Sequence, residues 1–301
     1  MRPPHTPSGT EAGPAPLGAA LPWTARLRLP RGGLSEWLSG GFLLALVLGA
    51  VFVEAIPGLA GPEFPWGDFS QPPEWSLNGL LGTDPLGRSI LSRVLHGART
   101  TLTITLLATA IALGAGLLLG MLAGFYRGMV ERAVDLYANA VAALPPILVI
   151  LALVAVVGNS VLTMTLALGL LDIGTYARVA KGGAIAQGER DYILAARAMG
   201  ASDGRLLLRE ILPNLLPSLT ALVPPLMAGL IVTEGSLSFL GYGIPPPAPS
   251  WGGMVASSTD LLDRFPLLVV GPILAIVLTV YALNTVGDAL ARRLGGRDRA
   301  A

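Results

Sequence analysis

Few residues of this chain have side chains that could carry out covalent chemistry. Lys181 is the only lysine, and residue 180 is alanine, so the sequence lacks the GxxxxGK(S/T) loop that binds ATP phosphates. The chain has no cysteine, which excludes disulfides, thiolate metal sites and a cysteine nucleophile. His5 and His96 stand apart, and no serine has a histidine partner in view. We therefore expect neither a catalytic nor a metal site.

Two carboxylates, Asp172 and Glu234, interrupt long apolar segments. A carboxylate is costly in lipid unless it faces protein or water, so each is a candidate functional residue. Glu234 could bind an amine, hold Arg88 or another arginine, or form a structural ion pair. Asp172 is followed less than two helical turns later by Arg178, which favours an anchor at the membrane interface over a proton relay. Neither acid has a histidine or second acid beside it, which argues against proton coupling.

The longest charged stretch between apolar segments, residues 187–217, predicts two short helices joined by a turn. Asp191 can cap or charge-stabilise a helix over residues 192–199. Gly200 is placed to end that helix in a left-handed conformation, and Ser202 offers an N-cap for a second helix. We expect the prolines that follow to mark the return of the chain to the membrane.

The first of these helices has a face that could dock a partner. Tyr192, Ala196 and Met199 share that face at i, i+4 and i+7, and the small Ala195 and Ala196 let the helix fit a groove. A short helix held between membrane segments can pass the motion of a docked soluble protein to them. An ordinary surface hairpin is the alternative.

The composition is that of a protein with several membrane helices. Of the residues, 52% are hydrophobic and 13% are charged, whereas a soluble domain has about 25% charged residues. The net charge of +1 gives no reason to expect a nucleic-acid partner. Six apolar segments approach the roughly 20 residues that cross a bilayer, which predicts an all-α polytopic membrane protein. They cover residues 37–53, 101–125, 137–157, 161–176, 215–240 and 265–286.

The distribution of Arg and Lys indicates which segments are cytoplasmic. Six crossings place both termini on one side. If that side is the cytoplasm, sixteen of the 20 Arg and Lys residues lie in cytoplasmic segments and four lie outside. We therefore expect cytoplasmic termini, with residues 177–214 as a cytoplasmic loop.

These segments divide the chain into a core and two tails. Residues 1–35, rich in Pro, Gly and Ala, predict a basic, mostly disordered tail. Residues 36–99 hold the first transmembrane helix and an extracytoplasmic segment, residues 100–293 the five-helix core, and residues 294–301 a cytoplasmic tail. A cleaved signal peptide is the alternative for the first span, but the basic region before it is too long and no small-x-small site clearly follows.

Glycines and prolines inside the spans predict close packing and bends. Gly116, Gly120 and Gly124 lie on one helix face and let another helix approach closely, either within the chain or from a second subunit. Proline pairs at residues 145–146 and 224–225 predict kinks, which suit a moving pathway or static packing equally.

The charged hairpin resembles the coupling loop of ATP-binding-cassette (ABC) importer permeases. That loop has Glu-Ala-Ala, three residues, Gly, and later an apolar residue and Leu-Pro. The matching positions are Ala195, Ala196, Gly200, Leu212 and Pro213. Leu194 replaces the Glu and Glu210 replaces the apolar residue, which changes polar contacts but keeps the helix–Gly–helix arrangement.

The resemblance covers roughly residues 80–293. GTDPLGR at residues 82–88, EGSLSFLG at 234–241, PSWG at 249–252 and GDAL at 287–290 resemble, in order, segments of the dipeptide, oligopeptide and nickel permease family, in its C-type subunit. Ser89 stands where that family usually has an acidic residue.

This resemblance implies a type I ABC importer permease (MetI-like) fold with six transmembrane helices. It implies ATP-driven import of di- or oligopeptides by alternating access across a bacterial or archaeal cytoplasmic membrane; a nickel chelate or another small solute is the alternative cargo. The implied partners are a second homologous permease, two ABC ATPases that carry ATP and Mg, an extracytoplasmic substrate-binding protein and membrane lipid. The chain itself would bind no cofactor.

The resemblance also gives a role to the outer segment, residues 245–252, as a gate rim or docking face; a rigid capping loop is the alternative. Candidate pathway or gate residues are Glu234, Trp251 and Arg88. A secondary transporter would need coupling acids deep in the spans. Only Glu234 and Asp172 come near that requirement. A membrane enzyme would need catalytic groups clustered at one depth, and none appears in the sequence.

Overall fold

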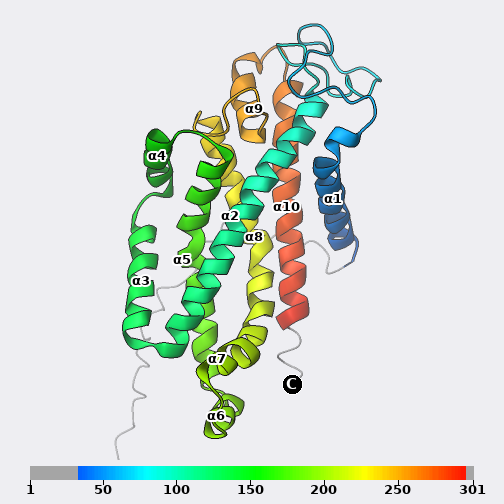
Figure 1. Ribbon diagram of the computed structural model, residues 1–301. Coiled ribbons are helices and arrows are strands. Elements are labelled where there is room, and N and C mark those ends of the chain that lie inside the picture. Colours follow the sequence, from blue (N-terminus) through cyan, green and yellow to red (C-terminus); the bar gives the residue numbers. More distant parts are fainter. Residues whose placement is uncertain (1–32, 296–301) are drawn as a thin grey trace, which may run out of the picture. The chain divides into compact units, whose positions relative to one another are not determined.

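The computed structural model describes residues 33–295, and the regular elements in that range are all helical (Figure 1). The predicted tails, residues 1–35 and 294–301, lie almost wholly outside this range. The prediction of an all-α protein is confirmed. The helices are α1 (Leu34–Val51), α2 (Ile90–Tyr126), α3 (Gly128–Ala143), α4 (Pro146–Val157), α5 (Val161–Gly188), α6 (Asp191–Ala198), α7 (Asp203–Arg205), α8 (Leu212–Phe239), α9 (Trp251–Ser258) and α10 (Leu267–Gly295). A π-helical segment, Leu206–Ile211, joins α7 to α8, and single 3-10 turns lie at Val53–Ala55 and Thr259–Leu261.

Four of the described helical segments are long and apolar enough to cross a membrane: α1, α2, the run from α7 through α8, and α10. The bent pair α3 and α4 is a fifth if it is counted as one broken span. α5 has 28 residues and runs among these helices, but its sequence is less apolar. The total of six crossings therefore depends on α5 and stays a prediction.

The predicted third span, residues 137–157, is broken rather than kinked. α3 and α4 meet at 88° across Leu144 and Pro145. Pro146 has no N–H to continue a helical hydrogen-bond ladder, and a proline disfavours the helical conformation of the residue before it. Leu144 and Pro145 accordingly have extended backbones, with ψ of 136° and 118°.

The predicted fifth span behaves differently, because α8 runs on through its prolines. Pro224 and Pro225 lie inside the helix, and Pro224 is buried. Pro213 is the second residue of α8 and directly follows the π-helical segment Leu206–Ile211, so its missing N–H falls where the helical hydrogen-bond pattern changes.

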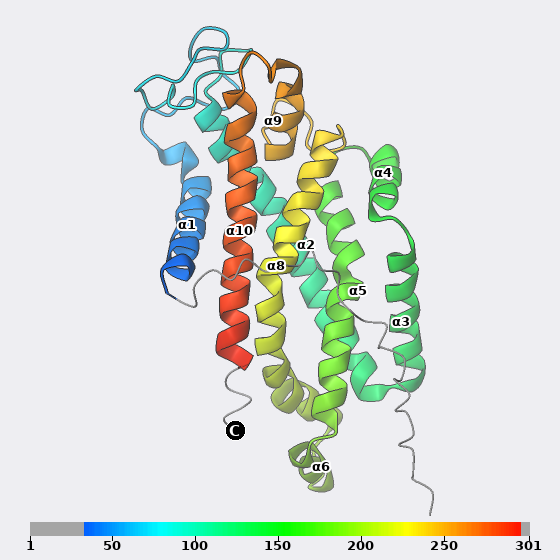
Figure 2. The same cartoon turned by 180° about the vertical axis from the view of Figure 1, so that it is seen from behind.

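The long helices run side by side, with α2, α5, α8 and α10 forming the bundle (Figures 1 and 2). α1 packs against α10, and α3 flanks α5. α9 and the loops between α1 and α2 cover one end of the bundle, here named the α9 end. α6 and α7 stand at the opposite end, here named the α6 end.

The glycine face of α2 packs against α5 of the same chain. A Cβ at Gly116 would lie 2.6 Å from the Cβ of Tyr176. A Cβ at Gly124 would lie 2.6 Å from the carbonyl oxygen of Lys181, and a Cβ at Gly120 would overlap a backbone carbonyl of α5. These glycines therefore pack against a helix of the same chain. The sequence alone left open whether their partner was an internal helix or a second subunit.

Candidate functional site

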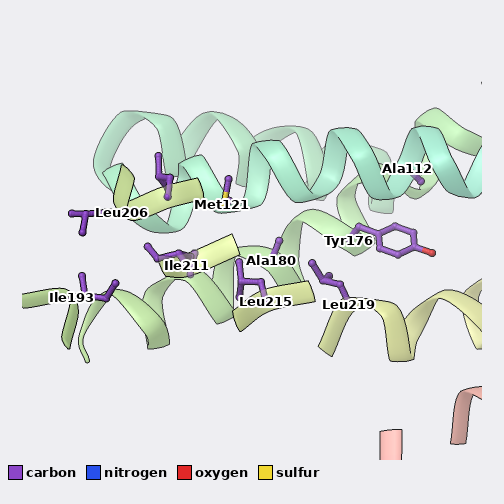
Figure 3. Packing of buried hydrophobic residues seen from close by; sticks show 11 residues of the cluster. Ala112, Met121, Tyr176, Ala180, Ile193, Leu206, Ile211, Leu215 and Leu219 are labelled. Carbon is purple, nitrogen blue, oxygen red and sulfur yellow. The ribbon is translucent and has the colours of Figure 1, made fainter. Parts of the chain in front are cut away.

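The helix–turn–helix at the α6 end is anchored by a buried isoleucine. Ile193 of α6 is fully buried, as are Leu206 and Ile211 of the π-helical segment. These side chains belong to one apolar cluster that also contains Met121 of α2 and Ala180 of α5 (Figure 3). The hairpin is therefore packed into the bundle rather than held on loose connections.

The turn after α6 has the conformation that its glycine predicts. Gly200 has φ of +83°, in the left-handed region. The N–H of Ala201 donates to the carbonyl oxygen of Ala196 at 3.0 Å, and the N–H of Gly200 donates to that of Arg197 at 3.0 Å. This pair of bonds is the Schellman arrangement that closes a helix C-terminus.

The second half of the hairpin differs from its prediction. Ser202 occupies the N-cap position of α7, but its side chain makes no capping hydrogen bond. The chain then continues from α7 through the π-helical segment into α8 with no intervening loop. Leu212 and Pro213 are therefore the first two residues of a long helix, with Leu212 half-buried against the apolar cluster and Pro213 exposed.

The exposed side of α6 carries apolar side chains next to the charged Asp191 and Arg197. Leu194 and Ala195 are exposed, and Met199 is 83% exposed. Ala196 is only partly exposed, because it packs against the apolar cluster. An apolar patch on a short helix at the end of a bundle is typical of a docking surface.

Tyr192 ties α6 to the neighbouring helices α5 and α8. Its hydroxyl donates to Oε1 of Gln187 at 2.9 Å and accepts from Nδ2 of Asn214 at 3.2 Å. Burial raises the pKa of Tyr192 above its ordinary value of 10.0, so the hydroxyl stays protonated and can donate at neutral pH.

Two arginines connect the hairpin to the end of α2. The guanidinium of Arg197 lies 5.4 Å from the centre of the Phe125 ring. Arg127, directly after α2, pairs with Glu189 at the start of the hairpin, with 2.6 Å between Nη2 and Oε1. Lys181 pairs with Asp135 at 2.6 Å and so joins α5 to α3. The α6 end is thus a set of helix ends tied together by side chains.

Glu234 lies nearer the α9 end and is fully buried between α2 and α8. Thr101 of α2 donates its hydroxyl to Oε2 at 3.0 Å, and Ser238 of α8 donates to Oε1 at 2.7 Å. Arg88 instead pairs with Asp84, with 2.7 Å between Nη2 and Oδ2. The expectation that Glu234 holds Arg88 or another arginine in an ion pair is therefore wrong for the described residues, because two hydroxyls already satisfy the carboxylate.

Trp251 begins α9 and is fully buried, not placed on an exposed rim. Its indole N–H donates to the carbonyl oxygen of Val94 at 2.9 Å. The ring lies against Gly97, where a Cβ would come within 3.1 Å of it. Trp251 therefore holds α9 on the outer part of α2.

Comparison with known proteins identifies this arrangement. Residues 116–299 match the family described as binding-protein-dependent transport system inner membrane component. The chain belongs to this family. It is 37% identical over 250 residues to the glutathione transport system permease protein GsiD of Shigella dysenteriae serotype 1 (strain Sd197), with 83% of this chain and 82% of the relative covered. The same identity and coverage hold for GsiD of Escherichia coli O157:H7.

The fold of the permease agrees with a solved structure. An inward-facing MetNI methionine ABC transporter chain superposes with a TM-score of 0.57 and 19% identity, covering 68% of this chain and 97% of that chain. The predicted family of ABC importer permeases and the MetI-like fold are confirmed. The permease is a multi-pass inner-membrane subunit and not an enzyme, since ATP hydrolysis in this family belongs to partner subunits.

Sequence reasoning missed the residue that anchors the hairpin. Ile193 points into the bundle, about 100° around α6 from the exposed Leu194, and stands three residues before the partly buried Ala196. That i, i+3 apolar spacing was present in the sequence and could have indicated a buried face. The contact between Arg197 and Phe125 had no comparable signal, because the two residues belong to segments far apart in the chain.

Proposed function

We propose that this chain is a transmembrane subunit of an ATP-driven importer of short peptides. The observation that carries the proposal is the α6 hairpin, which has an exposed apolar face and a buried anchor in Ile193. The 37% identity to a permease named for glutathione, itself a peptide, supports the cargo class. A nickel chelate or another small solute is the alternative cargo, and a secondary transporter is a weaker alternative.

Two ABC ATPases, which carry ATP and Mg, dock on the exposed face formed by Leu194, Ala195 and Met199. Their closure pushes α6. Because Ile193 is packed with the π-helical segment, α6 does not slide over the bundle but transmits its displacement to α8. Arg197 transmits it in parallel to the end of α2. Alternating access follows when these helices tilt.

A second, homologous permease covers the broken span. The break between α3 and α4 exposes Leu144, Ile147 and Leu148 on this chain. Irregular backbone at membrane depth is tolerated only where protein or a water-filled cavity covers it. The break therefore favours a pathway formed between two permeases, with lipid around the remaining helices.

An extracytoplasmic binding protein delivers the cargo at the α9 end. The arginine distribution favours cytoplasmic termini and so places the α9 end outside. Three aromatic side chains, Phe64, Phe69 and Trp75, are strongly exposed in the segment before α2. Exposed aromatic residues are frequent anchors of protein–protein interfaces. Glu234, Trp251 and Arg88 then act as gate residues indirectly, by fixing the outer parts of α2, α8 and α9.

Affinity purification of the tagged chain from mild detergent tests this proposal. We expect a second permease and ATPases with phosphate loops to copurify, and the reconstituted assembly to take up peptide only with ATP and the binding protein. Ala195→Arg places a large cation on the exposed face and should remove the ATPases, whereas Arg132→Gln, an exposed change on α3, should not. Transport by the chain alone without ATP would instead establish a secondary transporter.

A further inference from the structure

A cavity of about 230 Å³ lies among α3, α4, α5 and α8, beside the break in the third span. Its lining includes Val141 and Ala142 from the last turn of α3 and Pro146 from the start of α4. Leu230 of α8 closes it from another side. The cavity therefore lies at the middle of the long helices rather than at an end of the bundle, and a discontinuous helix borders it.

Two opposite charges line this cavity from one helix. Asp172 is half-buried near the middle of α5, and Arg178 follows six positions later. Neither takes part in the ion pairs formed by the described residues. One Nη of Arg178 donates to the carbonyl oxygen of Ala138 at 3.4 Å, which leaves most of its five N–H groups available. Arg178 is exposed, whereas Asp172 is half-buried and has no ion-pair partner among the described residues. A carboxylate at this depth is costly, so a ligand that brings a cation to Asp172 and an anion to Arg178 is favoured.

The lining supplies uncharged hydrogen-bonding groups as well. Thr175 lies between the two charges on α5, and Thr233 faces them from α8. The break leaves the last carbonyl groups of α3 without the helical partners they would have in an unbroken span. A peptide backbone, which needs both donors and acceptors, suits these groups better than an apolar solute does.

We propose that this cavity is a transient binding site for the charged ends of a short peptide on its way through the permease. The ammonium group of the peptide lies at Asp172 and its carboxylate at Arg178. Six helical positions separate the two residues by about 9 Å along the axis. An extended residue spans about 3.3–3.6 Å, so the spacing matches a peptide of about two to three residues and exceeds that of a single amino acid.

The small volume agrees with this length. The cavity is smaller than the roughly 300 Å³ at which typical ligand pockets begin, so it holds the backbone of a short peptide and not a long one. Side chains of the peptide extend past Ala142 and Pro146, which are exposed on this chain. The inference deepens the proposed function, on which it rests, by naming the substrate class and the residues that meet its two ends.

Cysteine accessibility tests the site directly, because the native chain has no cysteine. Thr175→Cys is introduced into the full assembly, and the rate of maleimide labelling of this chain is measured with and without a free tripeptide. We expect the tripeptide to slow labelling several-fold. The same peptide with an acetylated N-terminus and an amidated C-terminus, and a single amino acid, should leave the rate unchanged. A cysteine placed at Arg132, exposed on α3, should label equally under all conditions.

A second substitution, added to the Thr175→Cys variant, tests whether Asp172 and Arg178 are responsible for the protection of the cysteine by the tripeptide. With Asp172→Asn or Arg178→Gln, the peptide concentration that gives half protection should rise about tenfold or more, since each removes a charged hydrogen bond. Asp263→Asn and Arg132→Gln make the same chemical changes at exposed positions and should leave that concentration unchanged.

Two failures can be told apart. If the wild-type assembly imports peptide with ATP but the tripeptide never protects the cysteine, or the blocked peptide protects equally well, the cavity site is wrong and the proposed function stands. If the wild-type assembly imports no peptide, the proposed function and the site are both wrong.

Discussion

The guanidinium of Arg197 stands over the ring of Phe125, 5.4 Å from its centre. This contact joins the exposed helix of the hairpin to the last turn of α2, and it predicts a role in coupling. Arg197→Gln should keep ATPase activity but lower peptide uptake per ATP about two- to fivefold, because a contact of this type at an exposed site is worth about 0.5–1 kcal/mol. Arg197→Lys should retain part of the coupling. The ratio of uptake to ATP hydrolysis in proteoliposomes measures this, and an unchanged ratio would show that the contact transmits nothing.

Because Ile193 is buried and Leu194 is exposed, substitutions at these two positions should affect stability and ATPase docking differently. Ile193→Ala leaves a void in a fully buried cluster and should cost about 2–5 kcal/mol, lowering the unfolding temperature of the purified chain and releasing the ATPases. Leu194→Ala, one residue later and exposed, should weaken ATPase binding without changing the unfolding temperature. Equal unfolding temperatures for the two variants would contradict the anchor.

The turn after α6 predicts a backbone effect at Gly200. A Cβ there would meet open space, so Gly200→Ala introduces no clash and its cost comes from the left-handed backbone alone, about 1–2 kcal/mol. The loosened turn should be cut faster by trypsin after Arg197 and Arg205. Gly182→Ala, in open space inside α5, should leave cleavage unchanged. Equal cleavage rates in both variants would show that the left-handed backbone of Gly200 does not hold this turn.

The packing of α2 on α5 predicts a matched pair of substitutions within one helix. Gly120→Ala places a Cβ against the carbonyl oxygen of Ala177 and should cost about 1–3 kcal/mol through overpacking. Gly114→Ala meets nothing within 4 Å and should be neutral or stabilise the helix by about 0.5–1 kcal/mol. Thermal unfolding in detergent distinguishes the two, and a Gly120→Ala variant as stable as Gly114→Ala would mean that the helices do not pack this way.

The buried carboxylate predicts a graded response at Glu234. Glu234→Leu leaves the hydroxyls of Thr101 and Ser238 without their acceptor and should cost about 1–3 kcal/mol. Glu234→Gln keeps one acceptor oxygen and should cost less. Stability equal to wild type in the Leu variant would show that the two hydroxyls find other partners.

Much of the fold follows from local sequence features. The apolar segments predicted the long helices, Gly200 predicted the turn, and the glycines of α2 predicted a close helix contact. Each of these features depends on residues within one segment. Proline alone did not decide its outcome: the pair at 145–146 breaks a span, whereas Pro224 and Pro225 lie within a continuous helix. That difference depends on neighbouring helices, which a single segment does not reveal.

The candidate site was predictable only where its features depend on residues within one segment. The matched residues of the hairpin do lie together at one end, but their roles as docking residues stay predictions. The surroundings of Glu234 were not predictable, because its partner Thr101 comes from a distant segment and satisfies the charge without an arginine. Trp251 was expected at a gate rim because the family resemblance gives residues 245–252 that role, yet it is buried against Gly97.

The glycine face of α2 has a mechanical consequence. At Gly116, Gly120 and Gly124, which are about one helical turn apart, the backbone of α2 lies against the backbone and Cβ atoms of α5, so no long side chain separates the two helices there. They should tilt together as one stiff unit, and deformation must occur where the chain is compliant, at the right-angled joint between α3 and α4. The working stroke of the permease would then be limited by the bending of that joint and not by sliding in its core.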